Sequence, residues 1–343
     1  MPRRKHASRG TVEETSLKQV TRRFAAFALV VFATAPSVGA QQQPTAWPTK
    51  PIRIIVPAPP GGGYDRAMRP LAQEMAAQLK QPVIIDNKPG AGNIIGTQAG
   101  AAAAPDGYTL TMTGMLNTIA QGIYEHVPFD IVTDFAHIAC IGAAEQWLVV
   151  NSQAGIASFS ALIEQARREP GKLNYATSGQ GSTGHLVMEL LQRATGTQLT
   201  HVPYKGGAPA LQDVLAGHVP VTVIPGSGAM PHVQSGKLKV LAVSSAARVP
   251  GLPEAPTFEE LGYKQLTVVS WVGLSAPKGT PVEIVDKVSA AVRASLAQKE
   301  LGSKLAAEGL MAMPMPPAQY AQLVRSDTER WGRLTRSLNL KAN

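Results

Sequence analysis

Glycine- and serine-rich loops are the segments of this sequence whose residue types are best suited to chemistry. Four of them, at 59–65, 90–96, 178–185 and 204–209, stand between an apolar run and a helical pattern, and a fifth at 225–228 also follows an apolar run. Glycine lets backbone N–H groups approach a ligand closely, and a helix N-terminus carries unpaired N–H groups and about half a positive charge. Each loop alone is typical of a tight turn, but the set together indicates a site for a small organic anion.

The segment 179–184 matches the G-x-G-x-x-G pattern of dinucleotide-binding proteins. It follows an expected strand and begins an expected helix, as that pattern requires. The acidic residue that binds the ribose about 20 residues later is absent, because the next strand ends at Tyr204 and Lys205. Lys205 could instead bind the 2′-phosphate of NADP, so an exported NADP-linked oxidoreductase remains the alternative. Little free nicotinamide cofactor is available to an exported protein, and we therefore expect no cofactor.

Other catalytic or metal-binding patterns are absent from the sequence, so we do not expect an enzyme. The seven histidines show neither the H-E-x-x-H motif nor pairs at i, i+4, and no metal is expected. His185, near an expected helix start, could donate a hydrogen bond to an anion. Cys140 is interpreted as a small buried hydrophobe, and the alternating Met311, Met313 and Met315 as core or strand packing.

The net charge of +9 is concentrated at the N-terminus of the chain. Seven basic and two acidic residues lie in 1–23, and twelve uncharged, mostly apolar residues follow at 24–35, before small residues that end at Ala40. This is the pattern of a secretory signal, so residues 1–40 are expected to be a signal peptide cleaved after Ala40. The adjacent Arg22 and Arg23 leave both the Sec and the twin-arginine export routes open.

The residues after the signal peptide carry a net charge of only +4 and have no cluster of Lys and Arg interleaved with aromatic residues. A nucleic-acid partner is therefore not expected. These residues also lack the uninterrupted apolar stretch of about 18 residues that a membrane span requires. We expect the mature protein to be soluble, exported and a monomer.

Alternating strands and helices predict an α/β fold with mainly parallel sheets, in which ligands bind at the carboxyl ends of the strands. The expected strands are 51–56, 82–85, 108–113, 138–144, 147–150, 173–177, 199–203, 219–224, 238–244 and 266–274. The expected helices are one that Asp65 could cap, followed by 90–104, 158–168, 184–195, 208–216, 280–298 and 317–337.

A complete α/β unit separates two extended apolar runs, 147–151 and 267–273. Strands that enter and leave an inserted domain would give this pattern. We therefore expect a discontinuous domain 1, formed by 41–150 and 266–343, and an inserted domain 2 at 151–265.

From Trp47 to about Leu340 the chain resembles the periplasmic solute receptors of tripartite tricarboxylate transporters, the Bug proteins. The resemblance rests on segments that stand in the order typical of that family. They are 47–57 with the glycine loop through Asp65, 87–92, 105–109, 178–182 with His185, 201–210, 236–243 and 253–262.

The resemblance implies a two-domain periplasmic-binding-protein fold of the Venus flytrap type II, with a ligand cleft between its lobes. Such a receptor closes over a small carboxylate, such as a di- or tricarboxylate or an aromatic acid, and delivers it to the permease subunits of the transporter. A solute sensor for a membrane kinase remains open as well. The implied ligand-binding residues, partly acting through ordered water, are Pro59, Gly61, Gly62, Gly63, Tyr64, Ser178, Gly181, Ser182, His185, Tyr204, Lys205, Gly206, Gly207 and Ser227.

Three segments depart from the pattern of the family. Ala58 stands where an aromatic residue is usual, which predicts a roomier first loop, and 113–118 replaces a loop richer in Ser and His. Pro220 stands where the family has an acidic residue. An amino group on the ligand would have fewer acidic partners here, which favours a carboxylate without a positive charge.

Overall fold

The computed structural model describes residues 47–249 and 251–341. The predicted signal peptide lies outside the described residues, so its cleavage after Ala40 stays a prediction. Within the described ranges, no helix combines the length and the hydrophobicity that a bilayer crossing needs. The account below concerns the unit that begins at Pro48.

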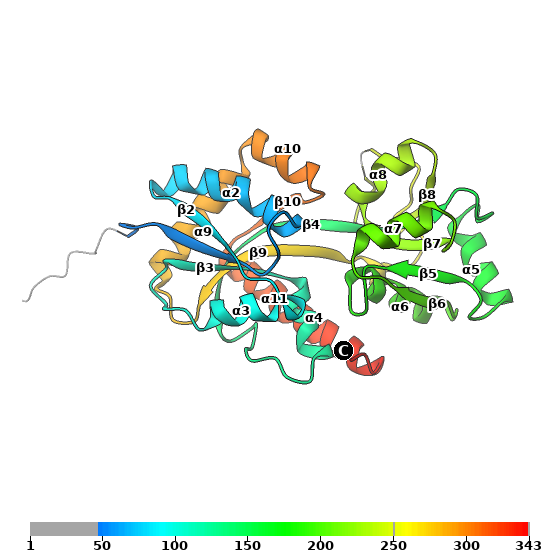
Figure 1. The fold of residues 1–343 in the computed structure, drawn as a ribbon, viewed down its shortest axis with the longest axis horizontal. Coiled ribbons are helices and arrows are strands. Elements are labelled where there is room, and N and C mark those ends of the chain that lie inside the picture. The colour runs from blue at the N-terminus through cyan, green and yellow to red at the C-terminus, as the bar shows by residue number, and fades with distance from the viewer. Residues whose placement is uncertain (1–46, 250, 342–343) are drawn as a thin grey trace, which may run out of the picture. The chain divides into compact units, whose positions relative to one another are not determined.

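The described strands form one mixed sheet of order β2-β1-β3-β9-β4-β7-β5-β6, with β8 and β10 paired to β4 (Figure 1). The strands are β1 Ile52–Val56, β2 Val83–Asn87, β3 Thr109–Gly114, β4 Phe135–Asn151, β5 Asn174–Thr177, β6 Thr200–Pro203, β7 Val221–Pro225, β8 Leu238–Val243, β9 Val269–Pro277 and β10 Met311–Met315. The α-helices are α2 Gly63–Leu79, α3 Ile94–Ala101, α4 Met115–Ile123, α5 Phe159–Arg168, α6 Thr183–Thr195, α7 Gly207–Leu215, α8 Gly226–Gln234, α9 Val282–Leu296, α10 Lys299–Ala307 and α11 Pro317–Ser337, and the short 3-10 helices are η1 Ala91–Asn93 and η2 Lys264–Leu266.

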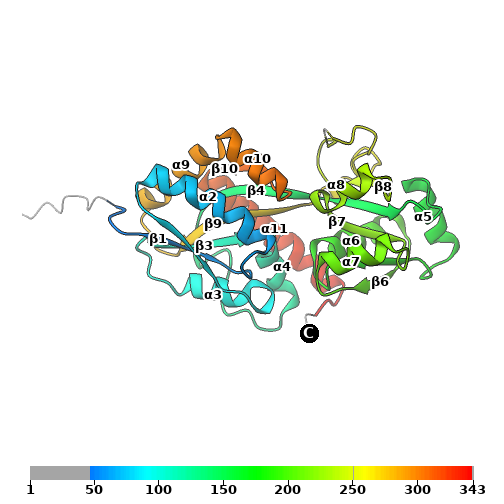
Figure 2. The same cartoon turned by 45° about the horizontal axis from the view of Figure 1, so that its top comes forward.

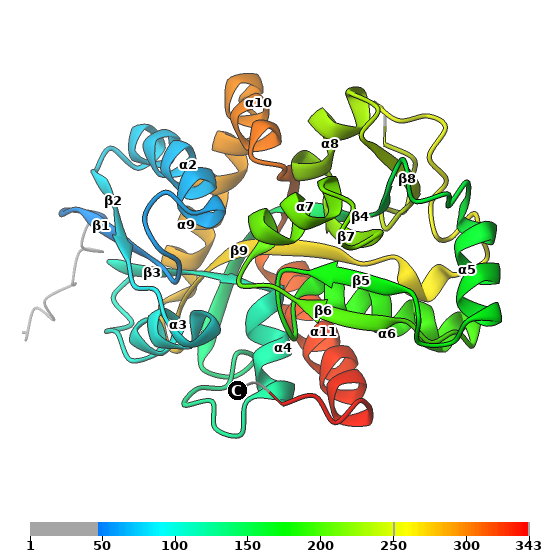
Figure 3. The same cartoon turned by 45° about the vertical axis from the view of Figure 1, so that its right-hand side comes forward.

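Two groups of three parallel strands repeat the same order within this sheet. The first is β2-β1-β3 and the second is β6-β5-β7, and β9 and β4 lie between them (Figure 3). Every antiparallel pair includes β4 or β9. The predicted α/β fold is confirmed. The sheet is mixed because β9 runs antiparallel to the first group and β4 runs antiparallel to the second.

Strand β4 joins the two groups. It pairs with β9 up to Glu145 and with β7 from Gln146 onward. We call lobe 1 the strands β1, β2, β3, β9 and β10 with the first part of β4 and their helices, and lobe 2 the strands β5 to β8 with the end of β4 and theirs. The division into domains at 150/151 and 265/266 stays a proposal, and β4 changes partners five residues before the first of these boundaries.

The helices of lobe 1 cover both faces of its strands. Figures 1 and 2 show α2, α9 and α10 on one face and α3, α4 and α11 on the other. Helix α11 packs on α4 and β4, and the Trp271 indole on β9 donates to Asp327 Oδ2 of α11 over 2.6 Å. This packing fixes the C-terminal helix to the sheet.

Several elements differ from the expectations. The strands expected at 138–144 and 147–150 are one strand, because the polar Glu145 and Gln146 between them continue the pairing instead of ending it. The helix expected at 90–104 is the turn η1 followed by α3, which ends at Ala101. Helices α4, α8 and α10 and strand β10 were not predicted as elements.

Two smaller expectations are confirmed, one in the core and one in the sheet. Cys140 is fully buried, and burial raises the pKa of its thiol to about 12. Met311 and Met315 belong to β10, which pairs with β4, as strand packing predicted. No group of three His, Cys, Asp or Glu side chains able to hold a metal ion occurs among the residues that the structure describes.

Candidate functional site

The two parallel groups present their strand-to-helix junctions at the carboxyl ends of their strands. In lobe 1 the junctions are β1–α2, β2–α3 and β3–α4, and in lobe 2 they are β5–α6, β6–α7 and β7–α8. Five contain the glycine-rich loops found in the sequence. The sixth, β3–α4, was not proposed as a site, because it consists of Gly114 alone and no run of small residues marks it. Ligands of α/β proteins bind at such edges.

Asp65 holds the first of these loops, β1–α2, in place. The sequence suggested that Asp65 caps the helix, but α2 begins at Gly63 and its N-cap position is Gly62. The buried carboxylate accepts from Gly61 N over 2.8 Å, from Arg69 Nε over 2.8 Å and from Asn87 Nδ2 over 3.0 Å. Burial would raise the pKa of Asp65, but these hydrogen bonds outweigh it and lower that pKa.

A second bond to the loop comes from the next residue on α2. Arg66 donates from Nη1 to Gly61 O over 2.5 Å and forms an ion pair from Nε to Glu308 Oε2 over 2.7 Å. Pro59 and Gly61 remain exposed at the surface of the loop, and Gly62 is half-buried. The loop is therefore fixed from behind, while its outer residues face solvent.

A cavity of about 210 Å³ brings together residues of both lobes. Tyr64 of α2 and Ser227 of α8, both predicted ligand contacts, line it together with Ser270 and Glu308. Burial raises the pKa of Tyr64 to about 12. It outweighs a hydrogen bond with Ser270, which acts to lower that pKa. Tyr64 is therefore a neutral hydroxyl near pH 7. The apolar part of the lining consists of Ala67, Ala144, Pro225, Val272, Gly309 and Leu310.

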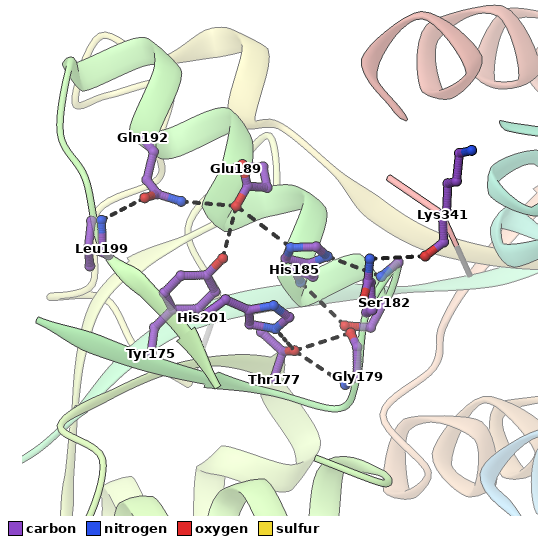
Figure 4. A network of polar contacts seen from close by, with 12 residues as sticks. Tyr175, Thr177, Gly179, Ser182, His185, Glu189, Gln192, Leu199, His201 and Lys341 are labelled. Atoms are coloured by element: carbon purple, nitrogen blue, oxygen red, sulfur yellow. Dashed lines mark hydrogen bonds and ion pairs between the residues drawn. The ribbon is translucent and has the colours of Figure 1, made fainter. Parts of the chain in front are cut away.

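The β5–α6 loop contains the predicted Ser178, Gly181 and Ser182, and the predicted His185 lies in the first turn of α6. Ser178 is exposed, and Ser182 is the N-cap of α6, where its Oγ accepts from His185 N over 3.3 Å. Gly181 is buried and donates its N–H to His185 Nδ1 over 3.0 Å. His185 is only 4% exposed, and its other nitrogen, Nε2, lies 3.6 Å from Glu189 Oε1 (Figure 4). Both ring nitrogens thus face protein groups.

The β6–α7 loop lies beside the β5–α6 loop, since Tyr204 N donates to Thr177 O over 3.0 Å. The Tyr204 hydroxyl donates to Asp213 Oδ2 over 2.6 Å, and this bond raises the pKa of Tyr204 to about 12. Lys205 is exposed and has no ion-pair partner among the described residues. The chain then enters α7 through its N-cap Gly206 and its first residue Gly207.

The predicted residues therefore fall into three groups. Tyr64 and Ser227 share the cavity, the loops at 178–185 and 204–207 adjoin each other in lobe 2, and the residues at 59–63 form the fixed first loop. A larger cavity of about 440 Å³ lies elsewhere in lobe 2, where Asn151 and Pro220 line it. None of the predicted site residues lines that larger cavity.

Lobe 2 offers positive charge and free donors. Within the described residues, the N–H groups of Thr183 and Gly184 in the first turn of α6 have no acceptor, and Lys205 stands unpaired on the neighbouring loop. A helix N-terminus and an ammonium group both attract anions. Two α/β lobes with such loops at the ends of their strands define the class of two-lobed solute-binding proteins.

Comparison with known proteins agrees with this class. The family described as "Tripartite tricarboxylate transporter family receptor" matches residues 67–340. The chain is 33% identical to the protein BugT of Bordetella pertussis, over 91% of this chain and 96% of that protein. The chain belongs to this family of Bug-type solute receptors.

Two solved structures from Rhodopseudomonas palustris are also similar. One, determined with adipate, shares 32% identity with a TM-score of 0.74 and covers 86% of this chain and 99% of its own. The other, MatC with bound malate, shares 31% identity with a TM-score of 0.70 and covers 84% of this chain and 100% of its own.

Proposed function

We propose that this protein is an exported, non-enzymatic receptor for a small dicarboxylate, which it delivers to the permease subunits of a tripartite tricarboxylate transporter. The observation that carries the proposal is the similarity to two structures of the same family, one with adipate and one with malate. Both of those ligands are dicarboxylates without a positive charge.

The local chemistry supports an anionic ligand. One carboxylate would accept from the N–H groups of Thr183 and Gly184 and approach the ammonium group of Lys205, as in many anion sites at helix N-termini. The residues at 59–64, Ser178 and Ser227 would contribute further N–H and hydroxyl groups from the other loops.

Thermal unfolding of the protein without residues 1–40 tests the proposal. We expect adipate, malate or a related di- or tricarboxylate to raise the melting temperature by roughly 5 °C or more at a hundredfold excess over its Kd. Glycine and NADP serve as the amino-acid and cofactor comparisons. If no carboxylate stabilised the protein at millimolar concentration, or NADP alone did, the receptor function would be wrong and the oxidoreductase alternative would gain support.

Substitution of Lys205 tests the role of its positive charge, and a second exposed lysine provides the matched control. Lys205→Gln should weaken the affinity for the stabilising acid several-fold, and less at high salt, because an exposed charge is screened by ions. Lys237→Gln, which removes an exposed charge from the turn before β8, is the control and should leave the affinity unchanged. Equal affinities for Lys205→Gln and the wild type would remove Lys205 from the site.

A further inference from the structure

Three rings from three elements stack beside the β5–α6 loop (Figure 4). The ring centroids of Tyr175 and His201 are 5.0 Å apart with 19° between their planes, and those of His201 and His185 are 4.0 Å apart with 9°. Tyr175 belongs to the strand before the loop, His185 to the helix after it, and His201 to the neighbouring strand. The stack therefore joins the two ends of the loop to the adjacent part of the sheet.

The two histidines of this stack bind the loop at two glycines. His201 Nε2 lies 2.6 Å from Thr177 Oγ1, which accepts from Gly179 N over 3.2 Å. His185 Nδ1 accepts from Gly181 N over 3.0 Å. Gly179 and Gly181 take φ of 129° and 73°, in a region that glycine enters freely. Because glycine backbone has the most freedom to lose, these bonds restrict the loop where it is intrinsically least ordered.

Glu189 favours the tautomer of His185 in which Nδ1 can accept a hydrogen bond. Since Gly181 donates to Nδ1, the ring proton is on Nε2, which faces Glu189 Oε1 at 3.6 Å. The same carboxylate oxygen accepts from the Tyr175 hydroxyl over 3.0 Å and from Gln192 Nε2 over 3.1 Å. A carboxylate held in this way keeps the ring in the tautomer and orientation that Gly181 requires.

We propose that His185 is a positioning residue of the receptor and makes no contact with its ligand. The ring fixes the position of Gly181, and Gly181 in turn positions the first turn of α6. The N–H groups of Thr183 and Gly184 in that turn are thereby presented to a carboxylate of the ligand. His185 has no nitrogen left for the ligand, since one faces Gly181 and the other faces Glu189. This inference rests on the proposed function.

Two amide substitutions separate the roles of the two ring nitrogens. His185→Asn places an acceptor oxygen near the position of Nδ1, whereas His185→Gln places its amide near Nε2 and leaves Gly181 without an acceptor. The readouts are hydrogen exchange of the Gly181 amide without any ligand, and the affinity for adipate and malate. Urea unfolding of each variant shows whether the fold is retained.

We expect His185→Gln to speed Gly181 exchange at least tenfold and to weaken acid binding about tenfold, in keeping with the loss of one buried hydrogen bond. His185→Asn should stay within about threefold of the wild type in both measurements. Equal exchange in the two variants would overturn the proposal. So would faster exchange in His185→Gln with unchanged affinity, or loss of affinity in His185→Asn with the Gly181 amide still protected.

The exchange measurement also distinguishes this inference from the function on which it rests. If the wild type bound no carboxylate, the proposed function would be wrong, whereas the exchange of Gly181 in the two variants would still decide whether His185 holds the loop. Should His185→Gln fail to fold, Glu189→Gln is the second variant. It keeps the imidazole but weakens its orientation, and it should speed Gly181 exchange by a smaller factor.

Discussion

The hydroxyl of Ser182 can serve the helix and a ligand, and the two roles have different energetic consequences. As the N-cap of α6, its Oγ accepts from His185 N and satisfies one of the free N–H groups of the first turn. The residue is half-buried, and in the proposed site its hydroxyl would donate a hydrogen bond to a carboxylate of the ligand. A single alanine substitution would affect both roles at once.

A pair of substitutions at Ser182 separates them. Ser182→Ala should lower the free energy of unfolding by about 1 kcal/mol, while Ser182→Gly should lower it by only a few tenths, because glycine is tolerated at the N-cap. Both variants lose the hydroxyl. If the hydroxyl binds the ligand, both should lose affinity in titration calorimetry despite their different stabilities. Wild-type affinity in Ser182→Gly would remove Ser182 from the ligand contacts.

Elements of this fold were predictable where the sequence pattern is local. Strands β5 and β6 and helices α6 and α7 lie within two residues of their expected bounds, because glycine and serine residues near their ends mark where each begins or stops. Helix α8 was missed because two glycines and Pro231 give it a low helix propensity, which its packing on β4 and β8 overrides.

The loops of the site were also predictable from local sequence, but the contacts that hold them were not. Arg66 pairs with Glu308, which lies 242 residues away, and the His185 ring stacks on His201 from another strand. No periodicity or motif marks such pairs, because they arise only when the elements pack. The sequence and its resemblance to the family proposed His185 as a ligand contact, and in the structure both of its ring nitrogens face protein groups.

The junction of β1 and α2 shows how one buried side chain can order an element boundary. Asp65→Ala removes the acceptor of three donors and should lower the free energy of unfolding by about 2 kcal/mol, the scale of hydrogen bonds to a buried charge. Urea unfolding measures this. Asp86→Ala, which breaks only the partly exposed ion pairs of Asp86 with Arg53 and Lys88, is the control and should cost less than 1 kcal/mol. Equal losses in the two variants would contradict an anchoring role for Asp65.

On the scale of the whole molecule, buried histidines in both lobes connect stability to pH. Burial lowers the pKa of His137 in lobe 1 to about 4, and burial together with the nearby His185 lowers that of His201 in lobe 2 to about 4. In the unfolded chain a histidine has a pKa of about 6.5. Between these values the unfolded state binds more protons than the folded state, so stability falls as pH decreases from about 6.5 to 4.

The carboxylates modify this dependence without removing it. Glu189 and Asp65 have pKa values that are lowered on balance by their hydrogen bonds. Their contribution to stability is fully present above the unfolded-state pKa values of about 4, and it is lost as pH falls below them. Asp327 acts in the opposite direction, because burial raises its pKa and protonation in the folded state then favours folding as pH falls. The contribution of the histidines is therefore best isolated by comparing variants at the same pH.

We expect the melting temperature of the wild type to fall between pH 6.5 and 4, and to fall less in His137→Gln and in His201→Gln. Glutamine carries a polar amide but takes up no proton, so each variant removes one site that the unfolded chain protonates preferentially. The reductions in acid sensitivity caused by the two substitutions should be additive, because the two rings lie in different lobes and share no hydrogen-bond partner. His126→Gln, which replaces an exposed ring, should follow the wild-type curve. Parallel curves for all four proteins would show that neither buried histidine is the source of acid sensitivity.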